Sequence, residues 1–263
     1  MKYAIIRLKK SGGIMKINLN YYKNILYVLI VFVIILGLFF GFWFYRGYLE
    51  KYENAEKYKD FVGVTQPITE DISPKLDIDF QNLQAANPDI FAWLDIPDTT
   101  ISYPILRSEK EDFYLTHNAD KEESQYGAIY TQNYNAADFS DFNTIIYGHN
   151  MRDGSMFGTL RNFKDKEFFE NHRIINIYTP SKKLTYTVFA AYTNDDTHIL
   201  FDNDFSDIEV RRKYIFDIQS GKKNSNVDRE INISEYNKII TLSTCTTPST
   251  KRLLVQAVLT KTE

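Results

Sequence analysis

The sequence predicts a mostly β domain, a closed barrel or sandwich of about eight strands, which follows one N-terminal transmembrane helix. Short β-like runs separated by turn residues recur from Phe91 onwards. The 19 Tyr and 19 Phe residues also favour strands. By contrast, the stretch from Ile25 to Tyr45 contains no charged side chain. With that stretch removed, the 263-residue chain has room for about one domain and a stalk.

The uncharged stretch Ile25–Tyr45 is predicted to be a transmembrane helix, because at about 1.5 Å per residue it spans roughly 31 Å. Aromatic residues at its ends fit interfacial belts: Tyr21, Tyr22, Tyr27, Trp43 and Tyr45. The preceding residues include no acid and six bases: Lys2, Arg7, Lys9, Lys10, Lys16 and Lys23. The positive-inside rule therefore predicts that residues 1–24 are cytoplasmic and that the chain after Tyr45 is extracellular.

A cleaved signal peptide is the alternative for this stretch. Its apolar core is too long for one, and no small residues follow at a cleavage spacing, since the stretch runs into Phe44–Arg46. Met15 is an alternative start, which would leave Lys16 and Lys23 as the basic flank. We expect an uncleaved, single-pass anchor in the lipid bilayer of the cell membrane.

Residues 46–79 are predicted to form a charged, helix-compatible stalk and a linker, which Pro67 and Pro74 bracket. The pattern from Leu76 to Ala86 predicts a short helix, which Asn87-Pro88 ends.

The globular domain is placed at residues 80–263, where about eight short runs have the composition of strands. The runs are Ala92–Ile96, Thr100–Leu106, Gly127–Tyr130, Asn143–Tyr147, Arg173–Tyr178, Leu184–Tyr192, Ile239–Cys245 and Arg252–Leu259. Their number and spacing predict a closed barrel or a sandwich.

One helix is predicted before the penultimate run. Ser206 and Glu209 have the spacing of a capping box, in which each side chain reaches the backbone of the other residue. Apolar residues then recur at helical spacing: Val210, Tyr214 and Ile218. Gly221 is placed to end the helix.

Cys245 is the only cysteine in the chain. An extracellular cysteine without a partner in its own chain is a candidate nucleophile. Strand alternation puts Ile240, Leu242 and Thr244 on one face, and Thr241, Ser243 and Cys245 on the other. Cys245 therefore lies on the polar face, towards a predicted groove. The alternative is burial, since free cysteine is among the most buried residue types.

Arg252 is the candidate partner of this thiol. In the last run Leu253, Val255, Ala257 and Leu259 make an apolar face, and Arg252, Leu254, Gln256 and Val258 make a mixed one. If the last two strands are neighbours, Arg252 shares a groove with Cys245, whereas Lys251 is in register with the apolar face.

A thiol nucleophile also needs a proton partner, and the chain has four histidines. His117 lies in a charged loop, His172 at a predicted helix end and His198 in an acidic loop. His149 differs because it follows the apolar run Asn143–Tyr147, and a strand end holds a side chain on a rigid base. We expect His149 to be this partner.

Metal sites and nucleic-acid binding are not predicted. One cysteine and four scattered histidines show no ligand spacing. Asp202–Asp204 is similar to the start of a calcium loop, but Asp207 and Lys213 stand where that loop needs Gly and Glu. The net charge of −3 gives no sign of a nucleic-acid partner. No cofactor is expected.

Two motifs carry a family resemblance. Thr241–Cys245 reads TLSTC and is followed by Arg252, and Tyr147–Met151 with Met156-Phe157 forms a histidine loop. These motifs resemble the sortases, most closely class B sortases, which are cysteine transpeptidases of Gram-positive cell surfaces. Further matches are Asn87–Leu94, Ile101–Ile105 and the helix after Ser206, and the resemblance covers about Phe80–Leu259.

The resemblance implies a closed eight-stranded sortase-type barrel, with one helix inserted before the cysteine strand and a catalytic domain at residues 80–263. Cys245 would attack the threonine carbonyl of a C-terminal sorting motif, His149 would exchange protons, and Arg252 would hold the substrate and stabilise the oxyanion. Three neighbours of the cysteine are expected to bind substrate: Ser243, Thr244 and, through its backbone N–H, Thr246.

The resemblance also implies the partners. The substrates would be surface proteins with an LPXTG-like or NPXTX-like sorting motif. The acceptor would be an amine of a peptidoglycan precursor or, in a pilin-polymerising enzyme, of a pilin subunit. Two alternatives remain: a thiol hydrolase that uses the same residues, and a non-catalytic surface binding barrel in which Cys245 is only a packed side chain of the core.

Overall fold

The computed structural model describes residues 9–10, 13–14, 19–56, 61–65, 75–221, 225–246 and 250–263. Its internal contacts divide the chain into two units, Met1–Lys57 and Tyr58–Glu263. Several residues used in the sequence predictions lie outside the described ranges: Lys2, Arg7, Met15, Lys16, Pro67 and Pro74.

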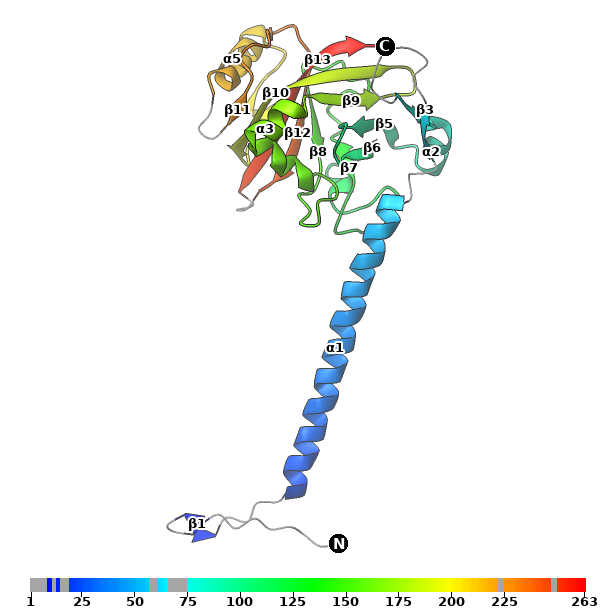
Figure 1. Ribbon diagram of the computed structural model, residues 1–263, viewed down its shortest axis with the longest axis vertical. Coiled ribbons are helices and arrows are strands. Elements are labelled where there is room, and N and C mark those ends of the chain that lie inside the picture. The colour runs from blue at the N-terminus through cyan, green and yellow to red at the C-terminus, as the bar shows by residue number, and fades with distance from the viewer. Residues whose placement is uncertain are drawn as a thin grey trace. The chain divides into compact units, whose positions relative to one another are not determined.

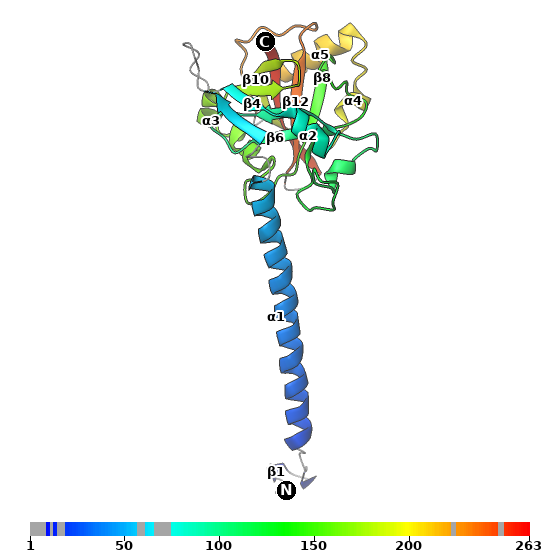
Figure 2. The ribbon, with the colours of Figure 1, turned by 90° about the vertical axis from the view of Figure 1, so that its right-hand side faces the viewer.

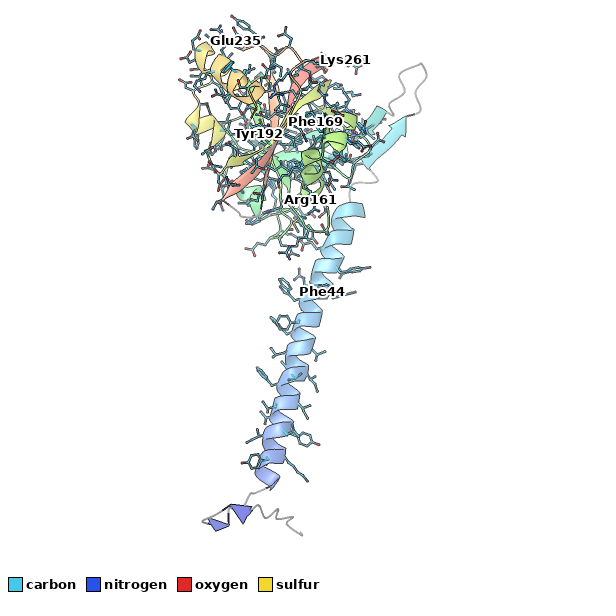
Figure 3. The ribbon with its side chains drawn as sticks, turned by 60° about the vertical axis from the view of Figure 1, so that its left-hand side comes forward. Phe44, Arg161, Phe169, Tyr192, Glu235 and Lys261 are labelled. Carbon is cyan, nitrogen blue, oxygen red and sulfur yellow. The ribbon has the colours of Figure 1, made fainter. Side chains whose placement is uncertain are left out.

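The N-terminal unit consists mainly of one long helix, α1 (Leu19–Glu56). It contains the whole predicted stretch 25–45 and continues into the predicted stalk. The part from Tyr22 to Glu50 is long and apolar enough to cross a membrane. Its side chains project from the helix in Figure 3, and that of Phe44 is 79% exposed. Such a continuous apolar surface is unfavourable in water and suited to lipid. Two short strands precede α1 and pair antiparallel: β1 (Lys9–Lys10) and β2 (Gly13–Ile14).

Eight strands of the C-terminal unit close into a barrel (Figure 1). They are β5 (Ile90–Asp95), β6 (Ser102–Arg107), β7 (Ile129–Thr131), β8 (Asn143–Tyr147), β9 (Ile174–Tyr178), β10 (Lys183–Asp195), β12 (Ile239–Cys245) and β13 (Lys251–Thr262). The order is β10-β13-β12-β8-β7-β6-β5-β9, and β9 pairs back onto β10. The two-residue β11 (Asn226–Val227) adds to β10 outside this circuit. The predicted mostly β fold is confirmed, as a barrel.

Two pairs of neighbouring strands in the barrel are parallel, β6 with β7 and β8 with β12. All other pairs in the circuit are antiparallel. Parallel strands run in the same direction, so β8 and β12 end at the same rim of the barrel.

Alternating side chains of the strands fill the barrel interior. Ile105, Ile146, Leu242 and Val255 are each fully buried in one central cluster. The cluster follows the period of two along each strand, which sends every second side chain inwards. The apolar faces predicted for the last two strands therefore face the interior.

Short helices and a hairpin cover the outside of the barrel. On one side α4 (Ile199–Asp202) and α5 (Ile208–Gln219) join a buried cluster with Phe189 and Leu254, α4 through Ile199 and α5 through Ile215 and Ile218. Elsewhere α2 (Phe80–Ala86) packs through Leu83 against Trp93 and Tyr114. Side chains of β3 (Val62–Thr65) and β4 (Lys75–Ile78) pack against the same cluster, and Figure 2 shows β4 beside α2. The remaining elements are the 3₁₀ helices η2 (Phe113–Leu115) and η3 (Gly158–Lys164) and the helix α3 (Lys166–Asn171).

The predicted start of the helix before the cysteine strand is wrong by one residue. Its cap is Asp207, whose carboxylate accepts from the N–H of Glu209 at 2.8 Å. Ser206 is not available, because its hydroxyl donates to Asp204 at 2.6 Å, and a carboxylate also complements the positive end of the helix dipole. The predicted end is confirmed, since α5 stops at Gln219 just before Gly221.

The helix predicted from Leu76 also begins later than expected. Leu76 and Ile78 belong to β4, where they pair with Val64 and Val62. Asp79 then caps α2, because its carboxylate accepts from the N–H of Asn82 at 3.1 Å. Part of the segment predicted as linker therefore packs against the barrel as the hairpin of β3 and β4.

Candidate active site

The strands that carry the predicted histidine and cysteine end side by side. In the parallel pair of β8 and β12, Tyr147 lies opposite Ser243, and His149 and Cys245 each follow two residues later. The antiparallel pairing of β12 with β13 places Arg252 directly opposite Cys245. The topology therefore brings these three side chains to one rim of the barrel.

The guanidinium of Arg252 contacts the cysteine sulfur. Its Nη1 donates to Sγ of Cys245, and its Nε donates to Oδ1 of Asp196 at 2.7 Å. Cys245 is half-buried and the Arg252 side chain is 30% exposed, so a molecule in solution can reach both. A guanidinium here can stabilise negative charge, either on sulfur or on an oxyanion bound beside it.

The ring of His149 is held by the end of η2 and by the segment that leads from it to β7. Its Nε2 lies 2.7 Å from the carbonyl oxygen of Leu115, which can only accept, so Nε2 carries a proton. Proton exchange is therefore left to Nδ1. The ring packs beside Gly127, whose φ is +56°; a Cβ there would lie 2.7 Å from the Leu115 carbonyl oxygen and 3.1 Å from the His149 ring.

Three hydrogen bonds tie the segment after β8 to the end of β12. The Gly148 N–H donates to the Ser243 carbonyl at 3.2 Å, and the Thr244 hydroxyl donates to the Gly148 carbonyl at 2.7 Å. One residue beyond His149, the amide of Asn150 donates to the Cys245 carbonyl at 2.8 Å. The histidine and cysteine backbones are thus fixed relative to each other.

The three predicted substrate-binding residues are placed differently. Ser243 lies on the cleft wall next to Cys245 and is buried. The Thr244 hydroxyl donates its proton to the Gly148 carbonyl, so it holds the backbone in place and does not offer this proton to a substrate. The Thr246 N–H donates to the Lys251 carbonyl at 3.0 Å and would have to leave it to bind an oxyanion.

A family model for the sortase domain matches residues 94–260. The chain belongs to the sortase family. Sortase B of Listeria monocytogenes is 34% identical over 221 residues, covering 82% of this chain and 88% of that protein. The crystal structure of sortase B from Bacillus anthracis in complex with AAEK1 has 30% identity and a TM-score of 0.68, covering 82% of this chain and 99% of that one. A Staphylococcus aureus sortase B–substrate complex has 29% identity and a TM-score of 0.60, covering 69% and 84%.

The predicted family and its class B likeness are thereby confirmed. Sortases are cysteine transpeptidases, so the chain is an enzyme of this class. The described residues contain the single cysteine of the sequence, and in those same ranges no cluster of His, Cys, Asp or Glu is arranged to hold a metal ion.

The sortase cleft has a volume of about 390 Å³, and Cys245, His149 and Arg252 all line it. Tyr147 forms part of its wall and stacks on Tyr130, with 5.4 Å between the ring centroids. Burial raises the pKa of Tyr147 to about 12, so its phenol stays neutral near pH 7. This part of the wall is therefore aromatic with uncharged hydroxyls, although acidic side chains such as Glu111 and Asp112 also line the cleft. Arg252 places a permanent positive charge beside the thiol.

The other histidines have structural partners. His117 stacks on Phe113 and shares a hydrogen bond with its carbonyl, and His172 caps α3. His198 caps α4, and its Nε2 lies 2.6 Å from the Tyr134 hydroxyl; it also reaches the cleft, which its acidic loop did not predict.

Three hydrogen bonds of the site were not predicted from the sequence: Asp196 with Arg252, Leu115 with His149 and Asn150 with Cys245. Leu115 acts through its backbone carbonyl and leaves no sequence signal. Asp196 stands in an acidic pair, but its sequence does not indicate which carboxylate meets an arginine.

Proposed function

We propose that this sortase is a membrane-anchored transpeptidase that cleaves a C-terminal sorting motif after its threonine and joins the surface protein to an amine of cell-wall peptidoglycan. The contact between Arg252 and Cys245 carries the proposal, together with His149 on the same cleft. These side chains supply a nucleophile, a stabiliser of negative charge and a proton carrier.

In the acylation step, the Cys245 thiolate attacks the carbonyl carbon of the motif's threonine. A bond forms between sulfur and carbon, and negative charge moves to the carbonyl oxygen, which the Arg252 guanidinium stabilises. When the bond from that carbon to nitrogen breaks, the His149 imidazolium donates its Nδ1 proton to the departing amine. A thioacyl enzyme and a free C-terminal fragment result.

In the transfer step, a primary amine attacks the thioacyl carbon. Neutral His149 accepts a proton from that amine at Nδ1, a new amide bond forms, and the bond to sulfur breaks to restore the thiolate. The proton now on His149 is the one used in the next acylation. The cycle therefore restores both the Cys245 thiolate and the His149 imidazolium.

The relatives support the proposed substrate class. The Staphylococcus aureus neighbour is described as a sortase B–substrate complex, which supports a substrate site in this same fold. For this chain we expect an NPXTX-like or LPXTG-like motif in a surface protein. The expected acceptor is an amine of a peptidoglycan precursor.

The proposed topology assigns residues 1–24 to the cytoplasm, 25–45 to the membrane, 46–79 to a stalk and linker, and 80–263 to the extracellular catalytic domain. One helix apolar enough to span a bilayer and the basic residues before it support this assignment.

A product assay tests the proposal. The detergent-solubilised full chain is incubated with sorting-motif peptides, with and without a peptide amine such as triglycine. We expect cleavage after threonine and, with the amine, a ligated product. Hydrolysis alone at every amine concentration would contradict a transpeptidase. Transfer to a pilin lysine but not to peptidoglycan amines would contradict the proposed acceptor.

A further inference from the structure

Arg252 is held from a second side by a residue outside the proposed catalytic set. We infer that Asp196 is a positioning residue, which aims the guanidinium of Arg252 at the sulfur and at the oxyanion formed beside it. The inference rests on the proposed role of Arg252. Its basis is one guanidinium with two partners: Nε donates to Asp196 Oδ1 at 2.7 Å, and Nη1 donates to Cys245 Sγ.

The backbone of Asp196 is itself anchored to the strand that carries the arginine. The N–H of Asp196 donates to the Thr250 carbonyl at 3.0 Å, just beyond the paired residues Asp195 and Lys251. The carboxylate therefore has a fixed place relative to β13. Because a guanidinium is planar and rigid, fixing its Nε also fixes the directions of its other nitrogens.

Two physical arguments favour a geometric role over a stabilising or electrostatic one. The Asp196 side chain is 48% exposed and that of Arg252 is 30% exposed, so solvent screens the pair and it contributes little to the free energy of unfolding. A carboxylate this close also offsets part of the positive field that Arg252 exerts on a nearby anion. If only charge mattered, Asp196 would weaken the site, so its benefit lies in orientation.

The adjacent residue provides a matched control. Asp195 has the same side chain, is the last residue of β10 and forms an ion pair with Lys251 at 3.1 Å. Its carboxylate is paired with Lys251, whereas that of Asp196 accepts from Nε of Arg252. Replacing Asp195 therefore removes the same charge from the neighbouring position and keeps the hydrogen bond between Asp196 and Arg252.

The test uses the full-length protein and measures kcat/KM for transpeptidation of a sorting peptide, together with Tm. We expect Asp196→Ala to lose on the order of 10- to 100-fold, because a small misplacement of a catalytic group is costly. Asp196→Asn keeps an oxygen that accepts from Nε and should stay within about 3-fold of the native enzyme. Asp195→Ala should stay within about 2-fold, and all three should keep a near-native Tm.

A double-mutant cycle shows whether Asp196 acts through the arginine. In an Arg252→Lys background, Asp196→Ala should lower kcat/KM by no more than about 2-fold further, because lysine has no guanidinium for Asp196 to orient. An equal loss of kcat/KM on Asp196→Ala in both backgrounds would overturn the inference. Native activity of Asp196→Ala would also overturn it. So would an Asp196→Asn variant that loses as much activity as Asp196→Ala. Should Arg252→Lys itself turn over peptide at the native rate, the proposed role of Arg252 fails, which is a distinguishable result.

Discussion

At the scale of single residues, His149 and His117 are a natural pair for comparison. Each has a ring nitrogen within hydrogen-bonding distance of a main-chain carbonyl, that of Leu115 for His149 and that of Phe113 for His117. Of these two histidines, His149 lines the cleft that contains Cys245, and His117 does not. The difference between the two is therefore one of position rather than of residue type or backbone contact.

This difference predicts opposite results for two alanine variants. His149→Ala removes the group that donates and accepts the proton, so both acylation and transfer should slow by roughly 10²–10⁴-fold. His117→Ala should keep native activity, because its ring stacks on Phe113 away from the thiol. Single-turnover acylation and steady-state transfer rates measure both. If His117→Ala were inactive and His149→Ala kept native activity, our assignment of the catalytic histidine would be reversed.

Much of the placement of site residues could be predicted from strand alternation. It predicted that Cys245 and Arg252 share a face, and the structure brings them into contact. It did not predict that Thr241, on the same face as Cys245, is fully buried beneath α5. Alternation gives the face of a side chain but not what covers that face, and only the part of the face beyond α5 opens into the cleft.

At the scale of elements, the buried polar network beneath α5 links this helix to the barrel. Gln256 donates through Nε2 to the hydroxyls of Tyr214 at 2.7 Å and Thr241 at 2.9 Å, and it accepts from Tyr192 at 3.2 Å. Burial raises the pKa of Tyr214, although hydrogen bonds from its neighbours partly offset the rise. The hydroxyl is therefore a neutral partner in the network.

Removal of this hydroxyl should destabilise the fold without affecting the chemistry. Tyr214→Phe leaves the Gln256 amide with one buried partner fewer, so we expect a loss of about 1–3 kcal/mol in the free energy of unfolding. Activity per folded molecule should be unchanged. The control is Phe216→Ala on the exposed side of α5, where the ring is 68% exposed. Denaturant titration measures both, and equal stability of the two variants would show that the network does not hold α5.

The strands and their order along the chain could be predicted, but the pairing of β8 with β12 could not. Periodicity identifies a strand and its faces from local sequence. The parallel pair of Tyr147 with Ser243 joins residues far apart in the chain, and nothing in either run specifies that partner or direction. This pairing places His149 beside Cys245. The proximity of the two side chains is therefore a property of the barrel, which the family resemblance implied and the motifs alone did not.

At the scale of the whole molecule, we expect one topology in the membrane. Protease added to intact cells should digest the chain after Tyr45, while a tag on residues 1–24 stays protected, because the basic flank precedes the apolar span. Immunoblots against the tag and against the C-terminal domain report both results. Protection of the C-terminal domain until the cells are lysed would mean that the anchor has the opposite orientation.

We propose that Cys245 carries the acyl group from one amine to another. The most direct test is mass spectrometry of the intact protein, mixed with a sorting-motif peptide in the absence of an acceptor. We expect an adduct with the mass of the peptide's N-terminal fragment, mapped by proteolysis to Cys245. The adduct should disappear as ligated product forms on addition of an amine, and Cys245→Ala should keep a native Tm and form neither. Ligated product from Cys245→Ala, without any thioacyl adduct on the native protein, would show that the acyl group does not pass through Cys245.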